Sequence, residues 1–136
     1  MKRPLIYVSH PFSSAPELNR VRARNNVRLL ANEFADSYTF VNPLDLFKAQ
    51  SDVLDDDVIL EQAIEVMKRC DGVLFCEGWE HSHGCCEEYK VAREINLPRW
   101  FGFYTFIQSY KDMVHEASQG VFSVGYASSN TKRCCS

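Results

Sequence analysis

Short apolar runs recur along the chain and predict β-strands. The runs Pro4–Val8, Tyr38–Val41, Gly72–Cys76 and Arg99–Phe103 are rich in β-branched and aromatic residues, which is typical of strands buried on both faces of a parallel sheet. Val121–Tyr126 is a weaker candidate of the same kind. We therefore expect a sheet of four to five strands.

The segments between these runs carry apolar residues at helical spacing, with polar residues in the other positions. They predict helices over residues 16–35, 44–50, 55–69, 84–95 and 106–117. Ser14 is placed near the first helix cap and Pro16 in its first turn. Asp55–Asp57 suit the positive end of the third helix dipole.

Strands and helices alternate, and this order favours crossover connections and a mostly parallel sheet in an α/β domain. With 136 residues the chain is long enough for one core. We expect a single domain over residues 1–127 and a polar, loosely held tail over 128–136. No internal repeat or low-complexity segment interrupts this pattern.

Composition excludes several classes of function. The net charge of −3 gives no reason to expect binding to a nucleic-acid polymer, and we interpret the arginines of the first helix as a solvated face; they are Arg20, Arg22, Arg24 and Arg28. No apolar run approaches the roughly 18–20 residues that span a bilayer, and the N-terminus lacks a signal-peptide core. A cytoplasmic location with six free cysteines is therefore expected.

The carboxyl ends of parallel strands meet at one edge of a sheet, and ligand sites form there. That edge is expected to gather Ser9, His10, the loop after Val41 and the loop Glu77–Gly84. The last of these loops connects a strand to a helix N-terminus, where backbone N–H groups are unpaired.

Glu88 lies one helical turn after Gly84 and is the candidate nucleophile or general base. A carboxylate near a helix N-terminus normally has a lowered pKa and stays ionised, and such a carboxylate can attack an oxocarbenium-like carbon. The alternative is that Glu88 only stabilises the first turn. Tyr7 reaches the same crevice from the first strand, or is a core tyrosine. Ser82 holds a phosphate or sugar hydroxyl, or is the helix N-cap.

A zinc site is a weaker interpretation of the same segment. His81, His83, Cys85 and Cys86 lack the paired spacing that holds zinc within one element, and a Cys–His nucleophile pair lacks an orienting third group. The glycine-rich dinucleotide and Walker motifs are absent from the sequence. We expect neither a metal nor a cofactor.

Three motifs together resemble the nucleoside 2-deoxyribosyltransferase-like superfamily. They are I-Y-V-S-H-P-F near the N-terminus, F-V-N-P in the middle and C-D-G-V-L-F-C-E-G-W-E-H-S-H-G-C-C-E-E-Y-K-V-A, and the similarity is closest to the DUF4406-type branch. The resemblance implies a flavodoxin- or Rossmann-like three-layer sandwich, usually oligomeric. It also implies cleavage of the N-glycosidic bond of a nucleoside or nucleoside 5′-monophosphate, by hydrolysis or by base transfer.

By the same resemblance, Glu88 is the nucleophile, Tyr7 orients it, Ser82 contacts a 5′-phosphate and Gly84 keeps the loop small beside the ligand. The full set of substrate-binding residues expected is Ser9, His10, Pro11, Phe12, Asn42, Gly78, Trp79, Ser82 and Gly84.

The chain departs from the family pattern at three positions. His10 occupies a turn position that is usually Gly, and Glu77 one that is usually Pro. Ala63 stands where relatives place an Asp that assists at the sugar and base; the acidic or polar residues that could substitute are Glu61, Gln62 and Asp55–Asp57. The second hypothesis is therefore a nucleotide-binding module of the same fold that does not turn over.

Overall fold

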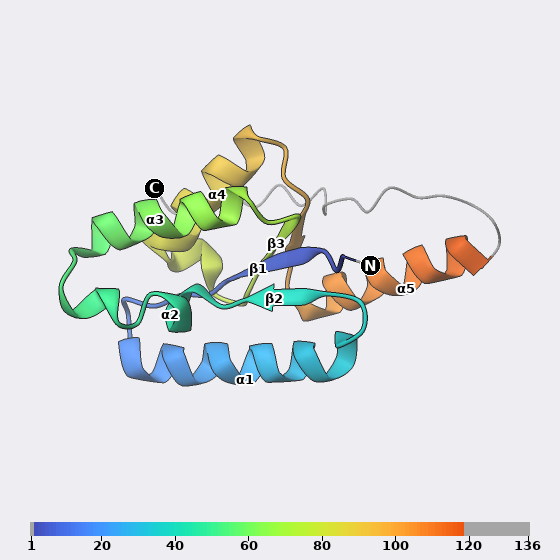
Figure 1. Cartoon of the computed structure of the whole chain (residues 1–136), viewed down its shortest axis with the longest axis horizontal. Coiled ribbons are helices and arrows are strands. Elements are labelled where there is room, and N and C mark those ends of the chain that lie inside the picture. Colours follow the sequence, from blue (N-terminus) through green and yellow to red (C-terminus); the bar gives the residue numbers. More distant parts are fainter. Residues whose placement is uncertain (1, 119–136) are drawn as a thin grey trace.

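The computed structural model describes residues 2–118, and its centre is one parallel sheet. The strands are β1 (Leu5–Ser9), β2 (Thr39–Val41), β3 (Gly72–Phe75) and β4 (Arg99–Phe101), in the order β2-β1-β3-β4 (Figure 1). The four predicted strands are confirmed. The fifth candidate and the predicted tail lie outside the described residues.

Helices cover both faces of the sheet and make a three-layer α/β sandwich (Figure 1). The helices are α1 (Pro16–Phe34), α2 (Pro43–Leu46), α3 (Asp56–Lys68), α4 (His83–Glu94) and α5 (Phe103–Ser118), with 3₁₀ turns η1 (Gln50–Asp52) and η2 (Trp79–His81). The strand order begins like that of flavodoxin-like folds, in which ligands bind where the strand order reverses. Here that point lies between β1 and β3.

Ser14 lies next to the α1 N-cap, Ala15, and Pro16 is in the first turn, as predicted; the Ser14 hydroxyl accepts a hydrogen bond from the Asn19 amide. Two other helix predictions need correction. Residues 44–50 are not one helix, because α2 ends at Leu46 and a 3₁₀ turn follows. Helix α5 begins three residues early, since Gly102 adopts a left-handed conformation (φ +88°) that turns the chain directly after β4.

Side chains alternate across the sheet and define two separate cores. Ile6 and Val8 of β1 point to the face covered by α1 and α5, where Phe106 is also buried. Tyr7, between them, points to the face covered by α3 and α4. Ser9 lies two residues after Tyr7 and therefore shares its face, because successive strand residues point to opposite sides.

The position of α4 is set at both ends by capping. Ser82 is the N-cap, and its hydroxyl accepts a hydrogen bond from the Cys85 backbone N–H at 3.3 Å. At the other end Asn96 adopts a left-handed conformation (φ 57°), and the Leu97 N–H bonds to the Ala92 carbonyl at 2.8 Å. This is a Schellman-type end. It confirms the predicted end of this helix and holds its buried face against the sheet.

Candidate functional site

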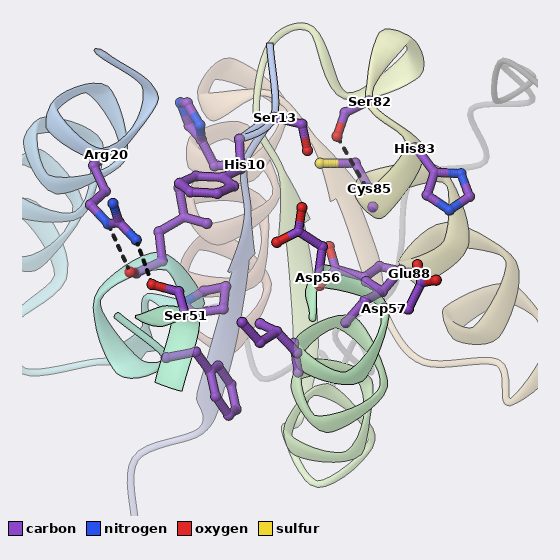
Figure 2. A pocket seen from close by; sticks show the side chains of 18 of the residues that line it. His10, Ser13, Arg20, Ser51, Asp56, Asp57, Ser82, His83, Cys85 and Glu88 are labelled. Atoms are coloured by element: carbon purple, nitrogen blue, oxygen red, sulfur yellow. Dashed lines mark hydrogen bonds between the residues drawn. The ribbon is translucent and has the colours of Figure 1, made fainter. Parts of the chain in front are cut away.

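A cavity lies over the carboxyl end of β1, between the first turns of α1, α3 and α4 and the segment that contains α2 (Figure 2). Its apolar wall comes from α2, the residue after it, and α3. The apolar lining residues are Pro43, Leu44, Phe47, Ile59, Leu60 and Ala63. Its polar lining includes the predicted nucleophile. The cavity therefore combines an apolar surface with a few charged groups, as small-molecule sites do.

Glu88 is held in the cavity by two hydroxyl groups of β1. The Tyr7 hydroxyl donates a hydrogen bond to Oε2, and the Ser9 hydroxyl donates one to Oε1 at 2.7 Å. Both donors reach the same carboxylate because they lie two residues apart on one strand face. The predicted contact between Tyr7 and Glu88 is present. We call this pair of hydrogen bonds from Tyr7 and Ser9 the clamp. It fixes the orientation of the Glu88 carboxylate, whose oxygens can still accept further hydrogen bonds.

Burial controls the protonation of this carboxylate. Glu88 is only 5% exposed. Burial raises its pKa from an ordinary value of 4.5 to about 7, while the hydrogen bonds from Tyr7 and Ser9 act in the opposite direction. The expectation that Glu88 stays permanently ionised is wrong, since removal of its carboxyl group from water raises the pKa. Near neutral pH, both protonation states of Glu88 are populated.

Tyr7 remains a hydrogen-bond donor over the working pH range. Burial raises its pKa well above 10, and the neighbouring charge of Glu88 raises it further. Two acidic groups that share one buried site cannot both ionise readily. The proton that moves at this site near neutral pH is therefore the one on Glu88.

Four of the predicted binding residues line the cavity beside this clamp; they are His10, Phe12, Ser82 and Gly84. The His10 imidazole Nδ1 lies 2.7 Å from the Pro11 carbonyl, so it donates in the neutral form. Burial lowers the pKa of His10, which favours that neutral form. A Cβ atom at Gly84 would lie 3.8 Å from the Leu60 Cδ1 atom, an ordinary contact.

The remaining predicted binding residues do not line this cavity. Asn42 caps α2, where its side chain accepts a hydrogen bond from the Leu44 N–H. Trp79 is 2% exposed and packs against Phe75 at a ring distance of 5.2 Å, because the η2 turn directs it into the core. Gly78, left-handed at φ 89°, borders a different hollow at the ends of β3 and β4. Pro11 lies beside Gly78: its Cγ atom is 3.6 Å from the position that a Cβ atom on residue 78 would occupy.

Arg20 lines the cavity, which the sequence pattern did not predict. Only 11% of its side chain is exposed, so it is not part of a solvated face. Its guanidinium donates to the Leu44 carbonyl and to the Ser51 hydroxyl, both at 3.5 Å, and lies 4.9 Å from the centre of the Phe12 ring. The helical pattern alone could not find it, because the α2 segment that covers it is distant in sequence.

Two acidic residues of α3 also face the cavity. Asp56 and Asp57, in its first turn, line the cavity together with Ala63. Asp56, Leu60 and Ala63 follow helical spacing along one side of α3. The wall therefore lacks a carboxylate at Ala63 but has carboxylates about two turns earlier. Of the possible substitutes Asp55–Asp57, two residues, Asp56 and Asp57, line the cavity.

The histidine–cysteine segment does not gather as a metal site. Among residues 2–118, no group of three or more His, Cys, Asp or Glu side chains is arranged to hold a metal ion. The four described cysteines are buried and form no disulfide with one another; Cys134 and Cys135 lie outside the described residues. No helix in the described part of the chain could span a membrane.

The fold and the cavity together define a class of protein: a parallel α/β sandwich with a small-molecule site at the carboxyl ends of its strands. Residues 4–100 match the family described as "Domain of unknown function (DUF4406)", and the chain belongs to that family. The match covers β1, β2 and β3, all but the last residue of β4, and Glu88. Neither the curated proteins nor the solved structures include a significant match.

Proposed function

We propose that this protein cleaves the N-glycosidic bond of a nucleoside or nucleoside 5′-monophosphate, with Glu88 as the nucleophile. The observation that carries the proposal is the clamp on Glu88: a buried carboxylate, oriented by Tyr7 and Ser9, in a ligand-sized cavity. The resemblance to nucleoside 2-deoxyribosyltransferases supports the same assignment. A carboxylate whose orientation is fixed by neighbouring groups can act as a nucleophile in covalent catalysis.

The chemistry has two steps. An ionised Glu88 oxygen attacks the anomeric carbon of the sugar, and the bond from that carbon to the base nitrogen breaks. The base leaves with the electron pair and takes a proton from water, while the sugar stays bound to Glu88 as an ester. A water molecule then attacks the same carbon and restores the carboxylate; attack by a second base gives transfer instead. Tyr7 and Ser9 orient the carboxylate throughout.

The apolar wall suits the base. Leu44, Phe47 and Phe12 provide apolar surface within the same cavity as Glu88. A base held there would place its sugar between the apolar wall and the carboxylate. Exclusion of water from this wall strengthens each electrostatic contact at the reacting carbon.

The test is a base-release assay with matched variants. The full chain is incubated with the common deoxyribonucleosides and their 5′-monophosphates, with and without an acceptor base, and products are separated by chromatography. Glu88→Gln should lower the rate by about 1,000-fold or more, a loss typical of removing a nucleophile. Glu87→Gln is the control, since Glu87 pairs with Lys90 at 3.6 Å on the same helix and does not line the cavity.

A glycosyl adduct should also form on the wild-type protein. Intact-mass measurement after rapid quenching is expected to show one added sugar residue, absent in Glu88→Gln. Equal base release by the wild type and Glu88→Gln would refute the nucleophile assignment.

The second candidate function is a binding module, and Ala63 favours it. This residue is buried in the cavity wall at a position where the resembled enzymes carry an assisting Asp. Thermal stabilisation by nucleosides with no product and no adduct would support binding without turnover. Detection of the adduct would exclude it.

A further inference from the structure

Arg20 brings a positive charge to one side of the cavity. Among residues 2–118 it is the only lysine or arginine that lines the cavity, and its side chain is 11% exposed. Its one ion pair within this range is with Glu17, whose Oε1 atom lies 3.6 Å from Nη1 and whose side chain is 92% exposed. An exposed carboxylate is well solvated and offsets little of the cost of burying a guanidinium. The charge of Arg20 therefore suits an acceptor that a ligand brings.

The guanidinium of Arg20 has more donors than the protein uses. It carries five N–H groups, of which Nε donates to the Leu44 carbonyl and Nη2 to the Ser51 hydroxyl, each at 3.5 Å. Both distances exceed the roughly 2.7–3.2 Å typical of an N–H···O bond, and within the described structure the other N–H groups form no hydrogen bond. The Phe12 ring, with its centre 4.9 Å from Cζ, holds the group in cation–π geometry. Arg20 is thus oriented and still able to donate.

Arg20 and Glu88 lie on opposite sides of the cavity (Figure 2). Leu44, part of the apolar wall proposed to hold the base, is also the residue whose carbonyl Arg20 contacts. The proposed reaction puts the anomeric carbon at Glu88, so the base extends towards Arg20 with the edge remote from the sugar. That edge carries the substituent on C6 of a purine or C4 of a pyrimidine, which is a carbonyl oxygen or an amino group. A guanidinium only donates hydrogen bonds, so it pairs with the carbonyl oxygen.

The departing base carries negative charge. When the bond from the anomeric carbon to the base nitrogen breaks, the electron pair goes to the base, and in an oxo base the charge spreads to the carbonyl oxygen. Ala63, buried in the cavity wall, has no group that could protonate the base, and the proton comes from water. A guanidinium fixed at the remote edge stabilises the charge until that proton arrives, as preorganised donors do.

We infer that Arg20 recognises a base with a carbonyl oxygen at its remote edge, a 6-oxopurine or a 4-oxopyrimidine, and stabilises the negative charge of that base as it leaves. This inference rests on the proposed function and deepens it by naming the substrate class. An amino base would turn its own N–H donors towards those of Arg20, and a donor that faces a donor excludes the ligand.

Binding of free bases tests the recognition without turnover. The full chain is titrated calorimetrically with two matched pairs, hypoxanthine against adenine and uracil against cytosine. The oxo base of each pair should bind about 10-fold more tightly, as expected for one hydrogen bond to a charged donor. Arg20→Gln should abolish this preference, because an amide both donates and accepts. Arg20→Lys keeps the charge without the planar fork and should keep only part of the preference. Circular dichroism checks that each variant is folded.

Kinetics test the stabilisation of the leaving base. Release of hypoxanthine from deoxyinosine should be faster than release of adenine from deoxyadenosine. Arg20→Gln should lower kcat for deoxyinosine by about 100-fold, a loss typical of removing one preorganised donor, and should lower kcat for deoxyadenosine less. The control is Arg24→Gln, which removes an arginine of the same helix that pairs with Asp45 at 2.9 Å and does not line the cavity. It should leave kcat and the base preference unchanged.

The outcomes separate this inference from the proposed function. Equal or tighter binding of the amino bases, no binding of any base, or a preference that is unchanged in the folded Arg20 variants would each overturn the role of Arg20. Base release without a preference for oxo bases would also overturn it and leave the proposed function intact. Selective binding of oxo bases that is lost in Arg20→Gln, with no base release from any nucleoside, would support recognition by Arg20 and refute the enzymatic proposal.

Discussion

The two faces of the sheet are built from the same strands but do different work. On the α1/α5 side, Ile6 and Val8 meet an aromatic cluster in which Phe34 and Phe106 pack edge to face, with ring centres 5.3 Å apart. On the α3/α4 side, Tyr7 and Ser9 meet the carboxyl group of Glu88. A single strand, β1, supplies both sets through simple alternation.

The difference shows how a small domain accommodates a buried acid. The α1/α5 face gains stability from apolar burial and ring contacts. The α3/α4 face contains a carboxyl group whose ionised form is disfavoured by burial. The α3/α4 face nevertheless has an apolar core of its own, which includes Met67, Phe75 and Trp79, so the buried acid lies within a face that also stabilises the fold. Active sites are commonly such local sources of instability.

The largest effect on stability is expected from truncating a buried aromatic side chain on the α1/α5 face. Phe106→Ala should lower the free energy of unfolding by about 3–5 kcal/mol, as for other buried aromatic truncations. Chemical denaturation measures this loss. Tyr104→Ala is the control on the same helix, since Tyr104 is 79% exposed, and it should change stability by less than about 0.5 kcal/mol. Equal losses in the two variants would contradict the assignment of the core.

Removing the Glu88 carboxyl group should raise the free energy of unfolding, which is the opposite of the effect of Phe106→Ala. The pKa of Glu88 is raised in the folded state, so the folded protein binds this proton more tightly than the unfolded chain does. That stabilisation is present below about pH 4.5 and is lost as pH rises through about 7. Glu88→Gln does not titrate, and it should therefore be more stable than the wild type by about 3 kcal/mol at pH 8.

The pH dependence is the check on this second prediction. Denaturation curves should show that the free energy of unfolding of Glu88→Gln exceeds that of the wild type by less than about 1 kcal/mol at pH 5. This difference should be larger at pH 8. A constant difference would mean that Glu88 titrates near its ordinary value in the folded protein.

A smaller effect, on the rate of base release, should come from removing the Tyr7 hydroxyl. The Tyr7 hydroxyl lowers the pKa of Glu88, so Tyr7→Phe should move that pKa further above 7. At pH 7 the rate of base release should fall by about 10- to 100-fold, the value of one hydrogen bond to a charged group, and should partly recover at pH 9. Tyr89→Phe is the matched control, a buried tyrosine that packs against Phe75. A loss that does not depend on pH would argue against this role.

The smallest effect is expected at the rim of the cavity. Gly84→Ala adds a methyl group at an ordinary contact distance from Leu60, and alanine is favoured over glycine in a helix by about 0.5–1 kcal/mol. Stability should stay equal or rise slightly, while KM rises because the methyl group occupies ligand space. Thermal denaturation and steady-state kinetics measure the two quantities. A loss of stability would show that the site has no room for a side chain.

Local patterns predicted the parts of the site that lie on regular elements. The position of Tyr7 on a strand and of Glu88 one turn into a helix placed both near one sheet edge but left Tyr7 open as a core residue, and the family resemblance supplied the prediction of their contact. The pattern failed for Trp79 and Arg20. In one case a 3₁₀ turn directs an expected ligand residue into the core, and in the other a distant segment covers an expected surface residue.

The sequence by itself determined the α/β class, the four strands and the candidate carboxylate, because strand alternation, helical spacing and capping residues are local properties. Only the tertiary structure decided how that carboxylate behaves. Its pKa depends on water removed by neighbouring elements and on two hydroxyls about 80 residues away in the chain. The structure also decided that Asp56, Asp57 and Arg20 share the same cavity, since the packing of α1 and α3 around one sheet edge brings their charges together.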